Sequence, residues 1–433
     1  MQNNQPVLLN KTNENSFASW VTNMPEAEIL RILRVTSKYY FAGGKPGVIP
    51  VKVFHEILDN IVQEEKNQIS KGNKEYLNNY NYGQTAGNPK LKEILAKRLQ
   101  NRDGLKNIDP ADVIITNGSQ QMIYTLCDSL INSNSIILSA RPTYLGFLQA
   151  VEKMGGNIVT LPSDDNGIIP EFIPSAIHQC ETELNKKTNM LYVVPYSDNP
   201  KGTTMPANRK DMLMDYAYEH DFFIVEDAAY KEIQFESLKI DPIKQRDPEN
   251  EKVAYVSSST KEAAAFRIGY SVLPSPLLKA AIKAKSCYDA CSSELLQAIL
   301  AQYYDKYIDK ALPQVRLTYK NRRDALVKAI DEHLKGYRTN NSGGFFVWFE
   351  SEDANFDSFS FLEHAIKDNV AYVPGKPFYP SKGFEFHDNG SLAPSKAKNN
   401  AFRLGYSVLE PEDIKIGIQR LAQLIDEHQQ ERS

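Results

Sequence analysis

The feature that most constrains the fold is an alternation of short apolar runs with amphipathic helical stretches between about residues 105 and 275. Parallel strands give near-continuous apolar runs because helices cover both faces of their sheet. We therefore predict an α/β fold with a doubly wound, mostly parallel, seven-stranded sheet. The expected strands are Val113–Thr116, Ile136–Ser139, Asn157–Leu161, Met190–Pro195, Phe222–Glu226, Val253–Ser257 and Ile268–Leu273. The expected helices between them include Gln120–Ile131, Leu145–Met154 and Arg209–Glu219.

The pattern changes after about residue 275, where long helical stretches lead into a block of mixed strands and helices. Strands are expected at Phe345–Glu350, Val370–Pro374 and Phe402–Val408, which indicates a smaller α+β domain. The polar stretch Lys382–Asn400 is interpreted as a surface excursion. We divide the chain into an N-terminal arm with part of the small domain (1–60), a large domain (61–310) and a C-terminal small domain (311–433).

Composition excludes several classes of function. The formal net charge of the 433 residues is -4, so no overall basic field recruits nucleic acid or an anionic membrane. No apolar run reaches the ~18 residues of a membrane-spanning helix, and Met1–Asn15 lacks the apolar core of a signal peptide. We expect a cytoplasmic protein with no metal site. The four cysteines form no Cys-x-x-Cys pair, and Cys287 and Cys291 are expected to be a buried core pair.

Ligands of a doubly wound sheet bind beyond the carboxyl ends of its strands, so the loops there carry the candidate functional residues. Gly118, Ser119 and Gln120 open a helix directly after the strand that ends at Thr116. Free N–H groups and the helix dipole make such a helix start a seat for phosphate. A plain helix cap at Ser119 is an equally open alternative.

Four further loops add an aromatic ring, an amide, a carboxylate and a set of cations. Tyr144 follows the second strand, where it could stack on a flat ring or simply pack. Asn199 stands in a turn, and Asp227 ends a buried strand, where a carboxylate needs a partner such as a protonated ring nitrogen. The loop that holds Ser258, Lys261 and Arg267 combines a hydroxyl, an amine and a guanidinium.

With these residues in order, the chain resembles the fold-type-I pyridoxal-phosphate (PLP) aminotransferases of class I/II, in particular the kynurenine and 2-aminoadipate aminotransferases. The resemblance covers about residues 26 to 427 and makes 61–310 the PLP-binding large domain. It includes Phe41–Pro46, Tyr82–Gly87, Gly343–Trp348 and Phe402–Tyr406. It implies an enzyme that moves an α-amino group between an amino acid and a 2-keto acid, working as a homodimer.

The resemblance also implies a role for each matching residue. Lys261 looks like the Schiff-base lysine and proton carrier, Asp227 like the partner of the pyridine nitrogen, and Tyr230 with Asn199 like donors to the ring oxygen. Tyr144 looks like the stacking ring, and Arg403 with Asn199 and Gly44 like the binding site of the substrate carboxylate. The phosphate ligands would be Ser119, Gln120, Ser258 and Arg267, with Tyr82 reaching in from a second subunit.

Two features depart from the family pattern. Lys201 occupies a position that usually carries a small hydroxyl residue, and we expect its charge to reach solvent or an acidic partner. The loop from Lys261 to Arg267 lacks the customary glycine and looks one or two residues short, which leaves the register of Arg267 open. The altered loop is also compatible with a second hypothesis, a PLP enzyme of another reaction type such as a decarboxylase, β-eliminase or oxidase.

A third hypothesis is a non-catalytic, aminotransferase-like ligand-binding protein. Regulators of that kind carry a DNA-binding extension, and we expect the roughly 25 residues ahead of the matching region to be too few for one. For the substrate, Tyr39, Tyr40, Phe41 and a helix over Ala27–Arg34 are expected to border the side-chain pocket. Asn23 and Met24 stand where an aminoadipate-preferring relative would carry an arginine, which favours an aromatic or aliphatic substrate; Arg31 or Arg34 could instead take that role from another turn.

Overall fold

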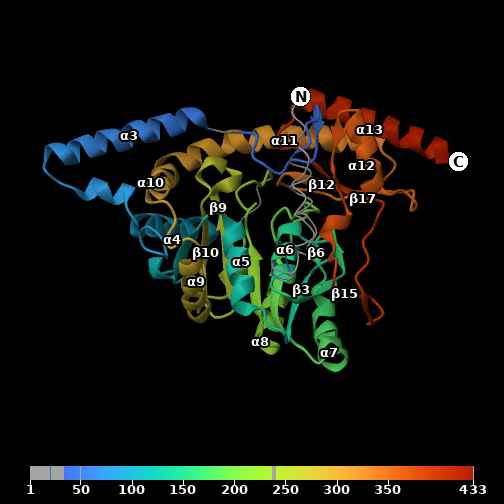
Figure 1. Ribbon diagram of the computed structural model, residues 1–433, viewed down its shortest axis with the longest axis horizontal. Helices are drawn as coiled ribbons and strands as arrows, with labels where there is room; N and C mark the ends of the chain where they lie inside the picture. Colours follow the sequence, from blue (N-terminus) through green and yellow to red (C-terminus); the bar gives the residue numbers. More distant parts are fainter. Residues whose placement is uncertain (1–19, 21–33, 49, 237–239, 433) are drawn as a thin grey trace, which may run out of the picture.

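A twisted sheet of nine strands dominates the fold of this protein, whose computed structural model describes residues 20, 34–48, 50–236 and 240–432 (Figure 1). The strand order is β16-β15-β4-β3-β7-β8-β9-β10-β2, parallel throughout β4-β3-β7-β8-β9 and antiparallel where β10 meets its neighbours. The seven strands predicted from the sequence are confirmed: β2 (Val113–Thr116), β3 (Ser135–Ala140), β4 (Asn157–Leu161), β7 (Lys187–Val193), β8 (Phe223–Asp227), β9 (Val253–Ser258) and β10 (Gly269–Val272).

Helices cover both faces of this sheet, and successive strand residues enter opposite cores. In β3, Ile136 and Leu138 pack with helices α7 (Ile173–Glu183) and α8 (Ala207–Glu219), whereas Ile137 packs on the other side. That other face is covered by α5 (Ser119–Leu130), α6 (Leu145–Lys153) and α9 (Ser275–Tyr288). Because strand side chains alternate between faces, only a continuously apolar strand can fill two cores, which explains the pattern in the sequence.

A second, four-stranded sheet has the order β11-β12-β17-β14. Its strands are β11 (Gly336–Arg338), β12 (Phe346–Ser351), β14 (Val373–Pro374) and β17 (Ala401–Gly405). Residues of three helices share one apolar core with this sheet: α11 (Ile308–His333), α12 (Ser358–Lys367) and α13 (Pro411–Arg432). The N-terminal β1 (Tyr39–Tyr40) pairs with β13 (Val370–Ala371), so the start of the described chain joins this C-terminal block.

The stretch expected as a surface excursion instead extends the large sheet. Strand β15 (Phe384–Phe386) pairs in parallel with β4 and antiparallel with β16 (Leu392–Pro394), which raises the predicted seven strands to nine. Phe386 is wholly buried in the core of the α7 and α8 face. The polar composition of the stretch hides this pairing because few of its side chains are apolar. The expected burial of Cys287 and Cys291 is also wrong, since Cys287 is exposed and Cys291 partly exposed.

The remaining helices, α3 (Val51–Ser70), α4 (Pro89–Asp103) and α10 (Glu294–Gln302), cluster at the β2 end of the sheet. In Figure 1, α3 projects from the body as a long arm. A π-helical turn over Tyr303–Tyr307 links α10 to α11. Among the described residues, no helix has both the length and the apolar content needed to cross a bilayer.

Candidate active site

A cavity of about 310 Å³ lies where the carboxyl ends of the parallel strands meet the small sheet. Nine residues predicted from the sequence line it together: Gly44, Ser119, Tyr144, Asn199, Asp227, Tyr230, Lys261, Arg267 and Arg403. The sequence analysis assigned no site role to the other eight: Lys45, Pro46, Leu145, Val194, Ala229, Thr260, Ala264 and Phe346. The loops converge because parallel strands end at one edge of a sheet, as the sequence argument required.

Lys261 lies in the turn directly after β9, inside this cavity. Its Nζ is 4.9 Å from the centre of the Tyr230 ring and 6.0 Å from that of Phe345. Burial lowers the pKa of Lys261 to about 8, and the nearby Asp227 opposes that shift. About a tenth of the amine is therefore neutral at pH 7, roughly 300-fold more than at the ordinary pKa of 10.5, and the neutral amine is the form that attacks a carbonyl carbon.

Asp227, the last residue of β8, is held by two donors. The Tyr192 hydroxyl donates to Oδ2 at 2.8 Å, and the Ala229 backbone N–H donates to Oδ1 at 3.1 Å. Tyr192 is itself fixed by a stack on Phe147 with ring centres 3.9 Å apart. Burial raises the pKa of Asp227, and these hydrogen bonds partly restore its acidity. The carboxylate is thus oriented into the cavity, where a cationic ring N–H would compensate its burial.

The start of α5 and Arg267 form a seat suited to phosphate. Gly118 has φ +77°, and a side chain there would lie 3.3 Å from the Arg267 guanidinium, so glycine permits this close approach. Ser119 is the first helical residue and points its end of the dipole at the cavity. The short loop after Lys261 reaches this place because Arg267 itself adopts a left-handed backbone, with φ 52° and ψ 30°.

Three of the predicted cofactor ligands lie outside the cavity lining. The Gln120 side chain accepts from the Tyr144 hydroxyl at 2.8 Å and donates to the Gly146 carbonyl at 2.9 Å. The Ser258 hydroxyl donates to that of Thr260 at 2.8 Å, and Thr260 takes the place at the cavity wall. Tyr82 is 87% exposed and faces a different hollow, next to Cys291 and Ser293. In this one chain, Tyr82 therefore does not reach the cavity.

Arg403 is a buried cation on β17, and no salt bridge to a carboxylate is recorded for it among the described residues. Its Nη1 donates to Asn199 Oδ1 at 2.7 Å, its Nη2 donates to the Ala42 carbonyl at 3.3 Å, and its Nε is buried without a partner. The guanidinium lies 3.9 Å from the centre of the Phe346 ring. Burial lowers the pKa of Arg403 to about 10. Such a cation is poised to take up a carboxylate.

The two tyrosines of the cavity are hydrogen-bond donors rather than anions. Burial raises the pKa of both Tyr144 and Tyr230, so each keeps its hydroxyl proton at neutral pH. Tyr230 packs edge-on against Phe345 and Phe346, which fixes its ring at the junction between the large and small sheets. Gly44 allows the loop after β1 to close over Phe346, because a side chain there would come within 2.8 Å of that ring.

Of the two outcomes expected for the charge of Lys201, solvent or an acidic partner, the structure excludes solvent. Lys201 is buried, with its Nζ 2.8 Å from the Asp164 carbonyl oxygen and with acidic side chains, Asp198 first among them, raising its pKa against the effect of burial. It also lies 3.4 Å from both the carbonyl and the hydroxyl oxygen of Ser163. The lysine thereby ties the turn that carries Asn199 to the β5–β6 hairpin (Ser163–Asp164 and Gly167–Ile168). The positions Asn23 and Met24, and all of the helix expected over Ala27–Arg34 except Arg34, lie outside the described residues.

Comparison with known proteins decides the family. The family model for aminotransferases of class I and II matches residues 51–421. The chain belongs to this family. It is 31% identical over 406 residues to aromatic-amino-acid aminotransferase 1 of Thermococcus litoralis, covering 92% of this chain and 91% of that protein. It is 26% identical over 405 residues to the 2-aminoadipate transaminase of Thermus thermophilus, covering 92% of each.

A solved structure agrees with this assignment. The kynurenine aminotransferase of Pyrococcus horikoshii, in complex with PMP, superimposes on this aminotransferase with a TM-score of 0.84 at 30% identity. The match covers 96% of this chain and 98% of the other. The protein is therefore a PLP-dependent aminotransferase of fold type I, and the first of the three functional hypotheses is confirmed.

The cavity of this aminotransferase fits PLP in each of the cofactor's functional groups. Its aldehyde needs an amine with a lowered pKa, its ring nitrogen a buried carboxylate, and its phosphate a helix start with a nearby guanidinium. Lys261, Asp227 and the Ser119–Arg267 seat provide all three within one cavity. When bound, the cofactor supplies an electron sink for the charge left on the substrate Cα.

Sequence reasoning assigned no site role to Tyr192, whose hydroxyl donates to Asp227, or to Phe346, whose ring lies against Arg403. Tyr192 lies inside an apolar strand, where nothing in the local pattern separates it from a core residue. A tyrosine among strand apolar residues does signal a hydroxyl that needs a partner, and Asp227 on the next strand is that partner. Phe346 follows a glycine pair and lies under Arg403 only because β12 pairs with β17.

Proposed function

We propose that this aminotransferase moves the α-amino group of an aromatic or aliphatic amino acid to a 2-keto acid, with Lys261 as the catalytic base. Apolar side chains form most of the rest of the cavity wall, among them Leu145, Val194 and Phe346. An aromatic or branched substrate side chain would bury apolar surface there, at roughly 25 cal/mol per Å². The name of the Thermococcus litoralis relative, an aromatic-amino-acid aminotransferase, supports the same substrate class.

Each group in the cavity has a defined part in this proposal. Arg403 binds the substrate α-carboxylate through its two terminal nitrogens, with Asn199 accepting from one of them and fixing the fork. Asp227 keeps the cofactor ring nitrogen protonated, and Tyr230 donates to the ring oxygen. Tyr144 stacks on the ring, while Ser119 and Arg267 hold the phosphate. Gln120 and Ser258 support this set by positioning Tyr144 and Thr260.

Lys261 carries the proton in this scheme. As a free amine, Lys261 is about one tenth neutral at pH 7 because burial lowers its pKa, and the neutral form can accept the proton of the substrate Cα–H bond. With PLP bound as the electron sink, the same Lys261 amine would hold that proton and could give it back to the ligand from the same side of the cavity. Arg403 and the phosphate seat hold both ends of the bound substrate–cofactor pair, which aligns the Cα–H bond with Lys261.

We further propose that the enzyme is a cytoplasmic homodimer in which Tyr82 completes the partner's site. Tyr82 is 87% exposed and remote from its own cavity. Helix α3 and the segment that leads from it to Tyr82 expose further apolar side chains, namely Val51, Leu58, Val62, Ile69, Leu77 and Tyr80. Such a surface is costly in water and suits a second copy of the chain. All four cysteines are free, which is typical of a reducing compartment.

Subunit mixing tests the placement of Tyr82. Two variants, Tyr82→Ala and Lys261→Ala, should each have low activity. A hybrid of one subunit of each has one site with Lys261 from the first subunit and Tyr82 from the second. If Tyr82 acts across the interface, the hybrid regains activity above both parents. If Tyr82 acted within its own chain, every hybrid site would lack one residue and mixing would restore nothing.

The observation that carries the proposed reaction is the union of Lys261, Asp227 and Arg403 in one buried cavity. The test is the visible absorption of the holoenzyme, mixed first with a panel of amino acids and then with 2-keto acids. We expect the cofactor spectrum to change with aromatic or aliphatic amino acids and to return with a keto acid. A change that no keto acid reverses, or release of carbon dioxide, would instead indicate the decarboxylase or eliminase hypothesis.

A further inference from the structure

Lys45 is a cation at the active site to which the proposed catalytic scheme gives no part. It lines the same cavity as Lys261, Arg267 and Arg403, whereas Asp227 is the one carboxylate among the described lining residues. In the scheme above, Lys261 serves the cofactor aldehyde, Arg267 its phosphate and Arg403 the substrate α-carboxylate. One positive charge, that of Lys45, is left over on the wall that faces the substrate.

The backbone around Lys45 is fixed, while its side chain is exposed. The Lys45 carbonyl accepts from the Ser407 hydroxyl at 2.7 Å, and the Gly47 and Val48 N–H groups donate to the Tyr319 hydroxyl at 3.0 and 3.2 Å. Three residues before Lys45, the Ala42 carbonyl accepts from Arg403. The loop therefore holds the Lys45 Cα at a set place relative to the substrate-carboxylate site, with a long side chain free to move.

No ion pair is recorded for Lys45 among the residues that the structure describes. A lysine head group in such a place keeps its hydration when the ligand is apolar and gains a partner when the ligand carries a second carboxylate. The distinction matters for a transaminase because both of its substrates, donor and acceptor, use one site. An apolar wall alone suits a substrate with an apolar side chain and offers no partner to a side-chain carboxylate.

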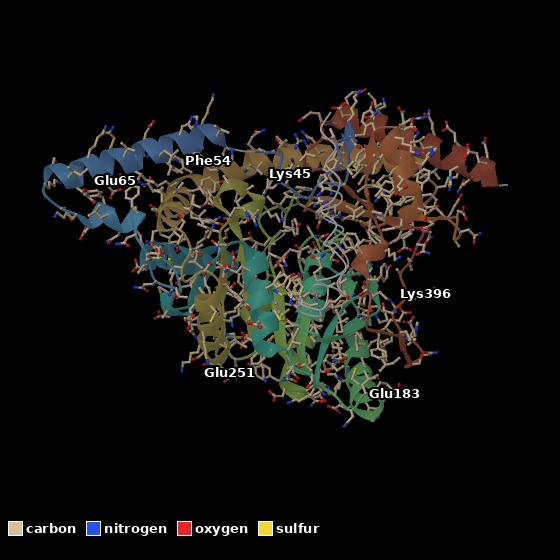
Figure 2. All side chains as sticks on the ribbon, viewed as in Figure 1. Lys45, Phe54, Glu65, Glu183, Glu251 and Lys396 are labelled. Carbon is tan, nitrogen blue, oxygen red and sulfur yellow. The ribbon has the colours of Figure 1, made fainter. Side chains whose placement is uncertain are left out.

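We infer that Lys45 determines specificity for a dicarboxylic substrate, an acidic amino acid and its 2-keto acid, by pairing with the side-chain carboxylate. This inference rests on the proposed function and adds the second substrate to it. For an aromatic or aliphatic partner, the same side chain swings to solvent and leaves the apolar wall to the ligand. Lys45 and the distant surface residue Lys396 are both labelled in Figure 2.

The experiment compares glutamate with glutamine, which has the same shape without the charge, and with phenylalanine. Single-turnover half-reactions of the holoenzyme give kcat/KM for each amino acid. The variants are Lys45→Met, Lys45→Glu and Lys45→Arg, with Lys396→Met as the matched control. Because an exposed ion pair is lost, Lys45→Met should lower the glutamate-to-glutamine ratio of kcat/KM by about 2- to 5-fold. Lys45→Glu should lower that ratio further, Lys45→Arg should retain most of it, and Lys396→Met should leave it unchanged.

Salt gives an independent measurement, since an exposed pair is screened and the glutamate reaction should weaken with ionic strength more than the glutamine reaction. A Lys45→Met ratio within twofold of the wild-type ratio would overturn the inference. So would a wild-type enzyme that reacts with phenylalanine but not with glutamate, and that result would leave the proposed function standing. A cofactor spectrum that no amino acid changes would instead contradict the proposed function itself.

Discussion

Replacement of Arg403 by methionine tests the substrate-binding site most directly. The guanidinium is buried, donates to Asn199 at 2.7 Å and has no recorded carboxylate partner among the described residues. Methionine keeps much of the side-chain length and removes the charge. It strands no opposite charge, so the free energy of unfolding should change far less than the binding of substrate.

The size of the expected loss follows from the burial of the pair that the substrate would form. Truncating one partner of a buried, hydrogen-bonded charge pair costs about 2–5 kcal/mol. At 1.36 kcal/mol per tenfold change, kcat/KM should fall by about 30- to 5,000-fold. The fall should be similar for the amino acid and for the keto acid, because both carry the α-carboxylate. Arg403→Lys should keep the charge but lose the fork, and should lie between wild type and Arg403→Met.

The assay is the half-reaction of the holoenzyme followed by cofactor absorption, once with an amino acid and once with a keto acid. Arg420→Met serves as the control, since Arg420 pairs with Asp368 on the surface of the small domain. Thermal unfolding shows whether each variant is folded. An Arg403→Met enzyme with unchanged KM and kcat/KM would refute the assignment. A loss of stability as large as the loss of kcat/KM would show a structural role instead.

Four further predictions concern three buried polar groups. Lys261→Ala should abolish the borohydride-fixed cofactor adduct, while circular dichroism shows that the fold is intact. An adduct retained on another lysine would exclude Lys261 as the Schiff-base residue. In wild type, cofactor capture by the apoenzyme should accelerate as pH rises through about 8, where the amine loses its proton, and not through the ordinary 10.5. Tyr192→Phe should slow turnover by about tenfold, because Asp227 loses one donor worth ~1–1.5 kcal/mol; an unchanged kcat would contradict that role. Lys201→Met should lower the free energy of unfolding by about 1–3 kcal/mol in urea, and no change would mean its buried contacts are neutral.

The sequence indicated the large sheet because its signal is local. Each of the seven strands is an apolar run, and five of them carry a candidate site residue within a few positions of the carboxyl end, as β8 does with Asp227 after Ile224 and Val225. The carboxyl-end rule then joined those loops into one site before any geometry was known. Resemblance added Arg403 and Gly44, which lie far from the other residues along the chain.

Contacts between distant segments could not be predicted in this way. Strand β15 was missed because its stability comes from pairing with β4, some 225 residues earlier, and its own composition is polar. The Lys261 loop looked one or two residues short, which left the register of Arg267 open. Arg267 lines the cavity with a left-handed backbone, and a residue pattern does not reveal the angle φ.

The sequence by itself therefore determined the fold class, the strands along the chain, and which loops carry the residues proposed to hold the cofactor. Only the tertiary structure decided which side chains share the cavity: Thr260 rather than Ser258 at its wall, Tyr192 behind Asp227, and Lys45 as an extra cation beside Arg403. Periodicity and propensity act over a few residues, whereas burial, and the pKa values that follow from it, depend on segments brought together from across the chain.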